Sequence, residues 1–358
     1  MKAGILTFSN ALNPGAVLQA FSLYSALEEA GHEAALIDYR CPAIEAMHAP
    51  RPVFKAGTPL KARVYNIFYN TVFLPRRLRY RGFLKRMRQV GPYTKKTIAQ
   101  LDGREDLFIT GSDQVFNLKL TGFDTAYYLD FVTKGKKTSF AAGAGTLGPE
   151  DADTAARLLS SFDHVSVREE YAARQLEKMC GVNAEVVPDP VFLHSGEEWK
   201  KLLNIKEDNK EKYVLIYSLY EMDILYDIAA LAAKKYGLKT VLITRTLRPR
   251  RKVDEVVKNA GPREFLSLIA NASYVVTNSF HGSAFSVIFG KSFNTFVSNK
   301  TSPWRIEELL EECGVPDRAV RIGSTGLVTD KADAEALKET AGRLRRRGLD
   351  YLEKITKG

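Results

Sequence analysis

The chain contains the same order of predicted elements twice: an apolar strand, a helix whose apolar side chains recur at helical spacing until a glycine ends it, and a second apolar strand. The first copy covers residues 3–8, 16–30 and 34–39, and the second copy covers residues 213–220, 224–236 and 238–244. Strands that alternate with helices in this way are typical of parallel α/β sheets. We therefore expect an α/β fold with a parallel sheet in each half of the chain.

Further strands and the length of the chain predict two domains. Six more apolar runs have strand character, at residues 107–110, 137–142, 164–167, 184–187, 274–277 and 292–297. A chain of 358 residues has the usual length of two domains. The charged stretch 194–212 is the natural boundary, so we expect an N-terminal domain over residues 1–200 and a C-terminal domain over residues 201–358. The last residues, from Asp330, are expected to form one or two helices.

The cysteines and the longer apolar runs limit the class of protein. Cys41, Cys180 and Cys313 are far apart in the sequence and odd in number, so no local disulfide framework or zinc site is predicted. HExxH and Walker motifs are also missing, and we expect neither a bound metal nor nucleotide triphosphatase activity. No run of eighteen apolar residues and no signal-peptide core occurs, so a cytoplasmic protein is expected.

The positive charge of the chain is concentrated in residues 46–101, which we call the basic segment. It contains thirteen basic residues and no acidic one, whereas the whole chain has a net charge of +10, so the remainder carries −3. Aromatic and aliphatic residues are interleaved on both sides of Pro75. Such a segment fits the anionic surface of a membrane, or it is a solvated helical face above an ordinary core stripe. Nucleic acid is not expected as a partner, since no recognised nucleic-acid motif accompanies the charge.

Polar residues directly follow four of the predicted strands. They occupy residues 111–114, 168–169, 188–190 and 278–283. Ligands of open α/β sheets bind beyond the carboxyl ends of the strands, so these positions are candidates for a binding site. If the two halves face each other, the four groups can line one cleft between them.

The residue types at these positions allow more than one role. His281 is either a proton donor or a structural loop residue, and Arg168 either clamps a phosphate or carboxylate or pairs with a neighbouring glutamate. Asp113 and Asp189 are general bases or turn-forming residues. A GxGxxG pattern at residues 143–148 is a tight turn or a phosphate site at a helix N-terminus. Spacing alone does not decide between these readings.

Several segments in combination resemble the polysaccharide pyruvyl transferase family. They are NPGAVLQAFSLYSAL near the start, then GSDQVFN, VREE, PDPVF and SFHGSAFS in this order, and the resemblance covers most of the chain. It implies two Rossmann-like domains that face each other across a cleft, as in GT-B glycosyltransferases. It also implies transfer of pyruvate from phosphoenolpyruvate to two hydroxyls of one sugar as a cyclic ketal.

The resemblance also implies roles for individual residues. His281 would be the catalytic histidine. The chemistry of the reaction, independently of the resemblance, favours a carboxylate such as Asp113 as the base. The donor site would comprise Ser279, Gly282, Ser283 and Arg305 of the C-terminal domain, together with Arg168 of the N-terminal domain. The acceptor site in the N-terminal domain would comprise Asn13, Gln19, Asp113, Gln114 and Asp189. Some members carry an arginine where this chain has Ser279, so another cation is needed. Arg305, Arg318 and the basic run 245–252 are the candidates, and Arg305 is favoured.

The chemistry of phosphoenolpyruvate fits these residue types. The donor carries a carboxylate and a phosphate, so its site needs fixed cations, and ketal formation needs a proton on the methylene carbon. No redox cofactor or metal is required. The alternatives are a GT-B-type glycosyltransferase that uses a nucleotide sugar and a two-domain protein that only binds sugars or nucleotides. The acceptor is expected to be a sugar of a surface polysaccharide or its lipid-linked precursor, which the basic segment would approach at the inner face of the membrane.

Overall fold

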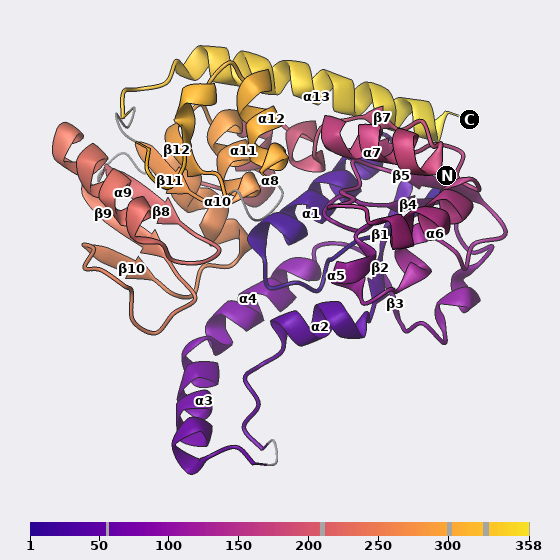
Figure 1. The fold of residues 1–358 in the computed structure, drawn as a ribbon, viewed down its shortest axis with the longest axis horizontal. Helices are drawn as coiled ribbons and strands as arrows, with labels where there is room; N and C mark the ends of the chain where they lie inside the picture. Colours follow the sequence, from indigo (N-terminus) through magenta and orange to yellow (C-terminus); the bar gives the residue numbers. More distant parts are fainter. Residues whose placement is uncertain (55–56, 208–211, 299–302, 325–328, 358) are drawn as a thin grey trace.

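The computed structural model describes residues 1–54, 57–207, 212–298, 303–324 and 329–357. Its strands form two large parallel sheets, one from each half of the chain, and helices cover both of them (Figure 1). The expected α/β class with parallel sheets is confirmed.

The first sheet has the strand order β3-β2-β1-β4-β5, and each neighbouring pair is parallel. Its strands are β1 (Lys2–Leu6), β2 (Glu33–Tyr39), β3 (Gln89–Tyr93), β4 (Leu107–Thr110) and β5 (Lys136–Ser139). Two short strands, β6 (Ser166–Val167) and β7 (Glu185–Val186), pair with each other beyond β5. The strand β3, which the sequence did not predict, contains a glycine and a proline, and proline is tolerated there because β3 lies at the sheet edge.

The second sheet has the order β10-β9-β8-β11-β12-β13 and is also parallel. Its strands are β8 (Tyr213–Tyr217), β9 (Lys239–Ile243), β10 (Glu255–Val257), β11 (Tyr274–Thr277), β12 (Ser292–Phe296) and β13 (Ala319–Val320). The two edge strands, β10 and β13, were not predicted. They are only two or three residues long, so they carry almost no periodicity.

Helices connect the strands in both halves. In the first half they are α1 (Pro14–Glu29), α2 (Pro42–His48), α3 (Leu60–Val72), α4 (Leu74–Leu84), α5 (Leu118–Thr121), α6 (Pro149–Leu159), α7 (Glu170–Cys180) and α8 (Gly196–Leu203). In the second half they are α9 (Asp223–Tyr236), α10 (Pro262–Asn271), α11 (Phe280–Ile288), α12 (Trp304–Glu312) and α13 (Ala334–Thr356). Short 3₁₀ turns occupy Ile98–Leu101, Thr125–Tyr128, Pro190–Leu193 and Pro316–Arg318. None of the helices among the described residues is long and apolar enough to cross a lipid bilayer.

One apolar core joins the two halves. The ring of Trp199 in α8 is fully buried and lies 6.2 Å from the ring of Phe21 in α1 and 5.4 Å from the ring of Phe285 in α11. Burial of large aromatic side chains contributes strongly to packing. The two sheets are therefore held together by shared core side chains as well as by the chain connection.

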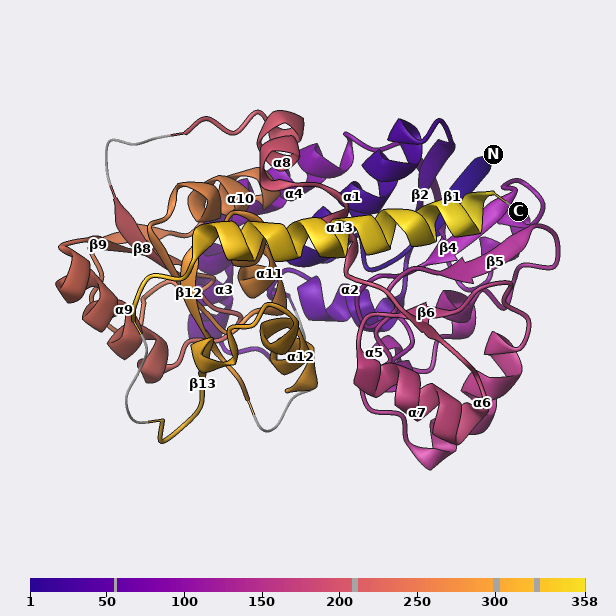
Figure 2. The ribbon, with the colours of Figure 1, turned by 90° about the horizontal axis from the view of Figure 1, so that it is seen from above.

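The C-terminal helix α13 spans both halves of the molecule (Figure 2). Its Tyr351 hydroxyl donates a hydrogen bond of 3.0 Å to the carbonyl of Ser139 at the end of β5. Gly348 in the same helix packs on Leu193, where a Cβ would lie 2.9 Å from a methyl carbon of that leucine. The tail that was expected to accompany the second half thus also packs on the first half.

Helices α3 and α4 of the basic segment form an arm between the two halves. Its helix α3 projects from the body of the protein (Figure 1) and has no buried residue. The following helix α4 returns to the body, where Arg79 lies 3.6 Å from the carboxylate of Glu264 in α10. The hydroxyl of Tyr69 donates a hydrogen bond of 2.9 Å to the carbonyl of Arg245 after β9. The arm therefore starts in the first half and contacts the second.

Candidate active site

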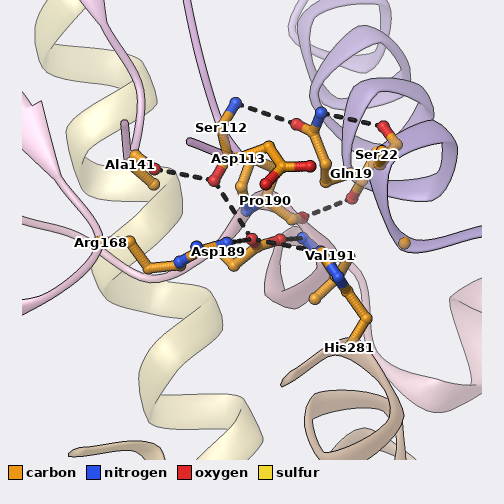
Figure 3. Close-up of polar contacts among 12 residues, drawn as sticks. Gln19, Ser22, Ser112, Asp113, Ala141, Arg168, Asp189, Pro190, Val191 and His281 are labelled. Carbon is orange, nitrogen blue, oxygen red and sulfur yellow. Dashed lines mark hydrogen bonds and ion pairs between the residues drawn. The ribbon is translucent and has the colours of Figure 1, made fainter. Parts of the chain in front are cut away.

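The candidate site lies where the carboxyl ends of the two sheets meet. Ser112 and Asp113 follow β4, Asp189 precedes the 3₁₀ turn at Pro190, and His281 lies in the first turn of α11 (Figure 3). Arg168 follows β6 and reaches the same point from the other side. The structure therefore brings together the polar groups that follow the predicted strands.

The carboxylate of Asp189 connects these groups. Its Oδ2 accepts hydrogen bonds from Arg168 Nη1 at 2.7 Å and from Ser112 Oγ at 3.2 Å, and its Oδ1 accepts one from the amide of Val191 at 3.1 Å. The Nε2 atom of His281 lies 3.6 Å from Oδ2. Burial would raise the pKa of Asp189, but its interaction with His281 and the charge of Arg168 outweigh this effect and hold the pKa well below its usual range. Asp189 is therefore an ionised hub, that is, a buried carboxylate that contacts several residues of the site.

Arg168 is compensated by two carboxylates. Its Nε donates a hydrogen bond of 2.8 Å to Glu169, its Nη1 donates to Asp189, and its guanidinium lies 4.4 Å from the centre of the Phe280 ring. Burial lowers the pKa of Arg168, but the charges of Glu169 and Asp189 outweigh burial and raise it. Its Nη2 atom has no hydrogen-bond partner among the described residues. The guanidinium thus has one donor group left for a ligand.

Arg305 is a second, partly buried cation beside Arg168. It lies in α12, its Nε is 3.4 Å from a Glu169 oxygen without a hydrogen bond, and its guanidinium lies 5.7 Å from the Phe280 ring centre. Burial and then the charge of Arg168 lower the pKa of Arg305. Its positive charge is therefore less neutralised than that of Arg168. The other proposed cations, Arg318 and the basic run 245–252, are not among the described residues that line the cavities at His281 and at Arg168. Arg318 donates to the carbonyl of Asp330, and Arg245 donates to the carbonyl of Leu219.

The position of His281 is fixed by the cap of helix α11 and by the packing of its ring on a glycine. Ser279 caps α11, its side chain accepting a hydrogen bond of 3.4 Å from the amide of Gly282. The imidazole ring of His281 packs directly on Gly15, where a Cβ would lie about 2.1 Å from Nδ1. Any side chain larger than glycine at position 15 would displace the imidazole. The Nε2 atom forms no hydrogen bond to a described residue.

A cavity of about 370 Å³ opens beside His281 and is lined from both halves. Of the predicted site residues it is lined by Asn13, Asp113, Gln114, Ser279, His281 and Arg305. Arg168 and Asp189 line a neighbouring cavity of about 290 Å³ instead, and Phe280 and Arg305 line both cavities. The two cavities therefore adjoin at Phe280 and Arg305.

The remaining predicted residues are buried within the protein. Gln19 is fully buried, accepts a hydrogen bond of 3.0 Å from the amide of Ser112 and donates one of 2.8 Å to Thr7. Ser283 donates to the carbonyl of Ser279 at 3.2 Å. At Gly282, a Cβ would lie 2.5 Å from the hydroxyl of Thr277. These residues position the loops that carry Asp113 and His281.

The GxGxxG pattern supports the Asp113 loop. The amide of Gly143 donates a hydrogen bond of 2.7 Å to the carbonyl of Asp113, and its carbonyl accepts one of 3.1 Å from the amide of Phe116. Gly145 has a φ of +65°, a conformation that glycine adopts without strain. This turn does not line the cavity of His281.

The sequence did not predict His48 as a site residue. His48 ends α2 in the basic segment and lines the same cavity as His281. Burial and the charge of Arg245 lower its pKa to about 4, so the imidazole is neutral at pH 7. The available signal in the sequence was the rarity of histidine, since His48 is one of only five histidines in the chain. Within the described part of the chain, no three His, Cys, Asp or Glu side chains form a group that could hold a metal.

Comparisons with known proteins give a family and several distant structures. The model of the polysaccharide pyruvyl transferase family matches residues 13–300. No curated protein matches the chain. The UDP-GlcNAc 2-epimerase of Methanocaldococcus jannaschii, solved with UDP-GlcNAc and UDP, is 13% identical with a TM-score of 0.48 over 100% of both chains. The glycosyltransferase SsfS6 of Streptomyces sp. SF2575 is 16% identical with a TM-score of 0.42, over 98% of this chain and 96% of that one. The heptosyltransferase WaaC of E. coli with ADP is 13% identical with a TM-score of 0.43, over 98% and 100%.

Proposed function

The chain belongs to the polysaccharide pyruvyl transferase family, and from this premise we propose that it transfers pyruvate from phosphoenolpyruvate to two hydroxyls of one sugar as a cyclic ketal. The observation that carries the proposal is the pair of cations Arg168, which is buried, and Arg305, which is partly buried: both lie near Phe280, and Arg305 also lines the cavity of His281. A donor with a carboxylate and a phosphate needs two such cations. The acceptor is a sugar of a surface polysaccharide or of its lipid-linked precursor.

The free donor groups of the two arginines are the proposed anchor of phosphoenolpyruvate. Arg168 Nη2 and Arg305 Nε are both buried and have no hydrogen-bond partner among the described residues. Leaving such groups unpaired is unfavourable, and a bound carboxylate or phosphate would pair them. Because Arg168 is already held by two carboxylates, Arg305 supplies most of the attraction for the incoming anion.

The reaction then requires one proton donor and one base. His281 gives its proton to the methylene carbon C3, which makes C2 electrophilic, and the first sugar hydroxyl adds to C2 while Asp113 takes its proton. The bond from C2 to the phosphate oxygen breaks, and the phosphate leaves with the proton from Asp113. The second hydroxyl closes the ring and returns a proton to His281. All protons balance, and this scheme uses no metal or redox cofactor.

The neighbours of His281 and Asp113 are positioning residues in this scheme. Asp189 and Gly15 hold the imidazole from two sides, and the hydrogen bond between Gln19 and the Ser112 amide fixes the start of the Asp113 loop. Reaction rates depend steeply on such alignment, so these contacts support turnover without touching the substrate.

The donor distinguishes this function from the alternatives. Phosphate release from phosphoenolpyruvate should depend on a glycan acceptor, and Arg305→Gln should raise the KM for phosphoenolpyruvate about tenfold or more. Arg346→Gln on α13 is the matched control, because it removes the same charge at a residue that lines neither cavity. Turnover that requires a nucleotide sugar, with none from phosphoenolpyruvate, would identify a glycosyltransferase instead.

We further propose that the enzyme works at the cytoplasmic face of the membrane, with the basic segment as its contact. Helix α3 exposes large apolar side chains beside its basic residues: Ile67 is 50% exposed and Phe68 is 58% exposed. Such a surface suits insertion between anionic headgroups. A lipid-linked acceptor would then be concentrated at the same surface as the enzyme.

A further inference from the structure

A second, strongly cationic pocket adjoins the cavity of His281. It has a volume of about 250 Å³, and the two pockets share Met47 and His48 in their walls. Its charged lining consists of arginines from the basic segment and from the loop after β9: Arg51, Arg76, Arg77 and Arg245. The described residues that line it include no Asp or Glu. The pocket therefore continues the active-site cavity toward the arm.

Among the described residues, the arginines of this pocket have only neutral partners. Arg76 Nη2 donates to the carbonyl of Leu12 at 3.0 Å, Arg77 Nη1 to that of His48 at 3.1 Å, and Arg245 Nη2 to that of Leu219 at 2.8 Å. The guanidinium of Arg51 lies 4.1 Å from the centre of the Tyr69 ring. In the described residues, no carboxylate lies within ion-pair distance of any of the four. This differs from Arg168, which has two carboxylates.

Arg76 is the most buried member of the group. It is 7% exposed, and its Nε has no hydrogen-bond partner in the described part of the chain. A buried charge without a counterion is costly, so clustered arginines of this kind normally await an anion. Forked guanidinium groups match the oxygens of phosphates in pairs, and four of them fit a group with more than one negative charge.

We propose that this pocket binds the diphosphate group through which the acceptor sugar is attached to its carrier lipid. This assignment rests on the proposed function. The sugar would occupy the cavity of His281, the diphosphate would lie among the arginines, and the lipid chain would continue past Tyr69 along the apolar residues of α3. The pocket would thus select acceptors by their linkage and would place the sugar against the donor.

Binding of inorganic pyrophosphate tests the pocket directly. We would titrate the protein by calorimetry with phosphoenolpyruvate present at saturation, so that the donor site is occupied. Arg51→Gln with Arg245→Gln should lower the affinity for pyrophosphate at least tenfold. Both side chains are exposed enough to be replaced without disturbing the core. The control, Arg81→Gln with Arg104→Gln, removes the same charge from exposed residues that do not line the pocket, and should bind as the wild type does. Equal affinities of the two double variants would overturn the proposal.

A kinetic comparison identifies the source of the phosphate. The wild type should have a lower KM for a sugar diphosphate on a short isoprenoid than for the methyl glycoside of the same sugar, and the pocket variant should lose this preference. If the wild type has the same KM for both acceptors, the assignment to the acceptor diphosphate is wrong. The assignment is also wrong if the pocket variant keeps the wild-type preference and loses only its binding to anionic vesicles. If phosphoenolpyruvate supports no turnover at all, the proposed function fails, while the pyrophosphate titration still decides whether the pocket binds phosphate groups.

Discussion

At the scale of single residues, the charged residues Arg168 and Asp189 have different tasks. Arg168 and Asp189 are buried against each other, and both also contact other polar groups of the protein. The sequence left Arg168 as either an anion clamp or the partner of a glutamate, and the structure shows the pairing with Glu169 and one free donor atom. Asp189, which is expected in the acceptor site, contacts several protein groups and lines the cavity next to that of His281. Its surroundings are those of a residue that holds others in place.

Replacement of His281 tests the proton donor. His281→Ala should lower kcat by roughly 10²- to 10⁴-fold, the usual contribution of general acid catalysis, and should leave the affinity for phosphoenolpyruvate nearly unchanged. His164→Ala is the matched control, because His164 lines neither cavity of the site. Steady-state rates and a separate binding titration give the two values. Near-normal turnover of His281→Ala would remove the histidine from the mechanism.

Replacement of Asp189 tests the buried hub through its pH dependence. Since its pKa is lower in the folded protein than in the unfolded chain, the carboxylate stabilises the fold above the ordinary aspartate pKa of about 4. This contribution is lost as the pH falls toward the folded value. Asp189→Asn should lower the free energy of unfolding by about 3 kcal/mol at pH 7, because it leaves Arg168 with one carboxylate.

Urea unfolding from pH 7 down to pH 3 measures this effect. The difference between wild type and Asp189→Asn should shrink below about pH 4, since the wild-type carboxylate then loses its advantage over the amide. Asp153→Asn on the exposed face of α6 serves as the control and should differ little from the wild type. A difference between wild type and Asp189→Asn that stays constant over this range would contradict the ionised hub.

At the scale of elements, the sequence predicted where the strands next to the site end, but it did not predict which helices contribute residues to the site. The predicted strands 107–110 and 274–277 coincide with β4 and β11, because four buried apolar residues followed by polar ones are a strong local signal. The loops after these strands carry Asp113 and His281. His48 was missed because α2 reaches the cavity only through tertiary packing, which leaves no trace in local spacing. Arg305 was favoured through the family resemblance, and periodicity alone would not have placed it.

The exposed face of α3 carries the prediction of membrane contact. The double variant Ile67→Ser with Phe68→Ser should lower the affinity for anionic vesicles about tenfold, because two apolar side chains no longer insert into the membrane. Less of this variant should therefore co-sediment with the vesicles. Lys61→Gln with Arg63→Gln should weaken binding mainly at low salt, where charges are poorly screened. Arg76 and Arg79 are unsuitable for this test, since the first is buried and the second contacts Glu264.

The control for this experiment is Phe123→Ser with Leu231→Ser. These side chains are 58% and 49% exposed and lie outside the basic segment. Their loss should leave vesicle binding at the wild-type level. If the α3 variant and this control sediment equally with anionic vesicles, the arm is only a solvated surface.

At the scale of the whole molecule, the two halves form one body. The shared core around Trp199 and the course of α13 over both halves tie the sheets together (Figure 2). The sequence predicted a helical tail from its periodicity, but periodicity identifies an apolar face and not the surface that this face covers. The same limit applies to the basic segment, whose charge was evident while its contact with the second half was not.

The most direct test of the proposed function follows the pyruvyl carbon itself. Phosphoenolpyruvate labelled with ¹³C at C2 would be incubated with the enzyme and a lipid-linked glycan, and the product examined by NMR and mass spectrometry. We predict a labelled ketal carbon bonded to two oxygens of one sugar, with one phosphate released for each ketal formed, and neither signal with His281→Ala. A glycan that stays unlabelled while the enzyme transfers a sugar from a nucleotide donor would contradict the account.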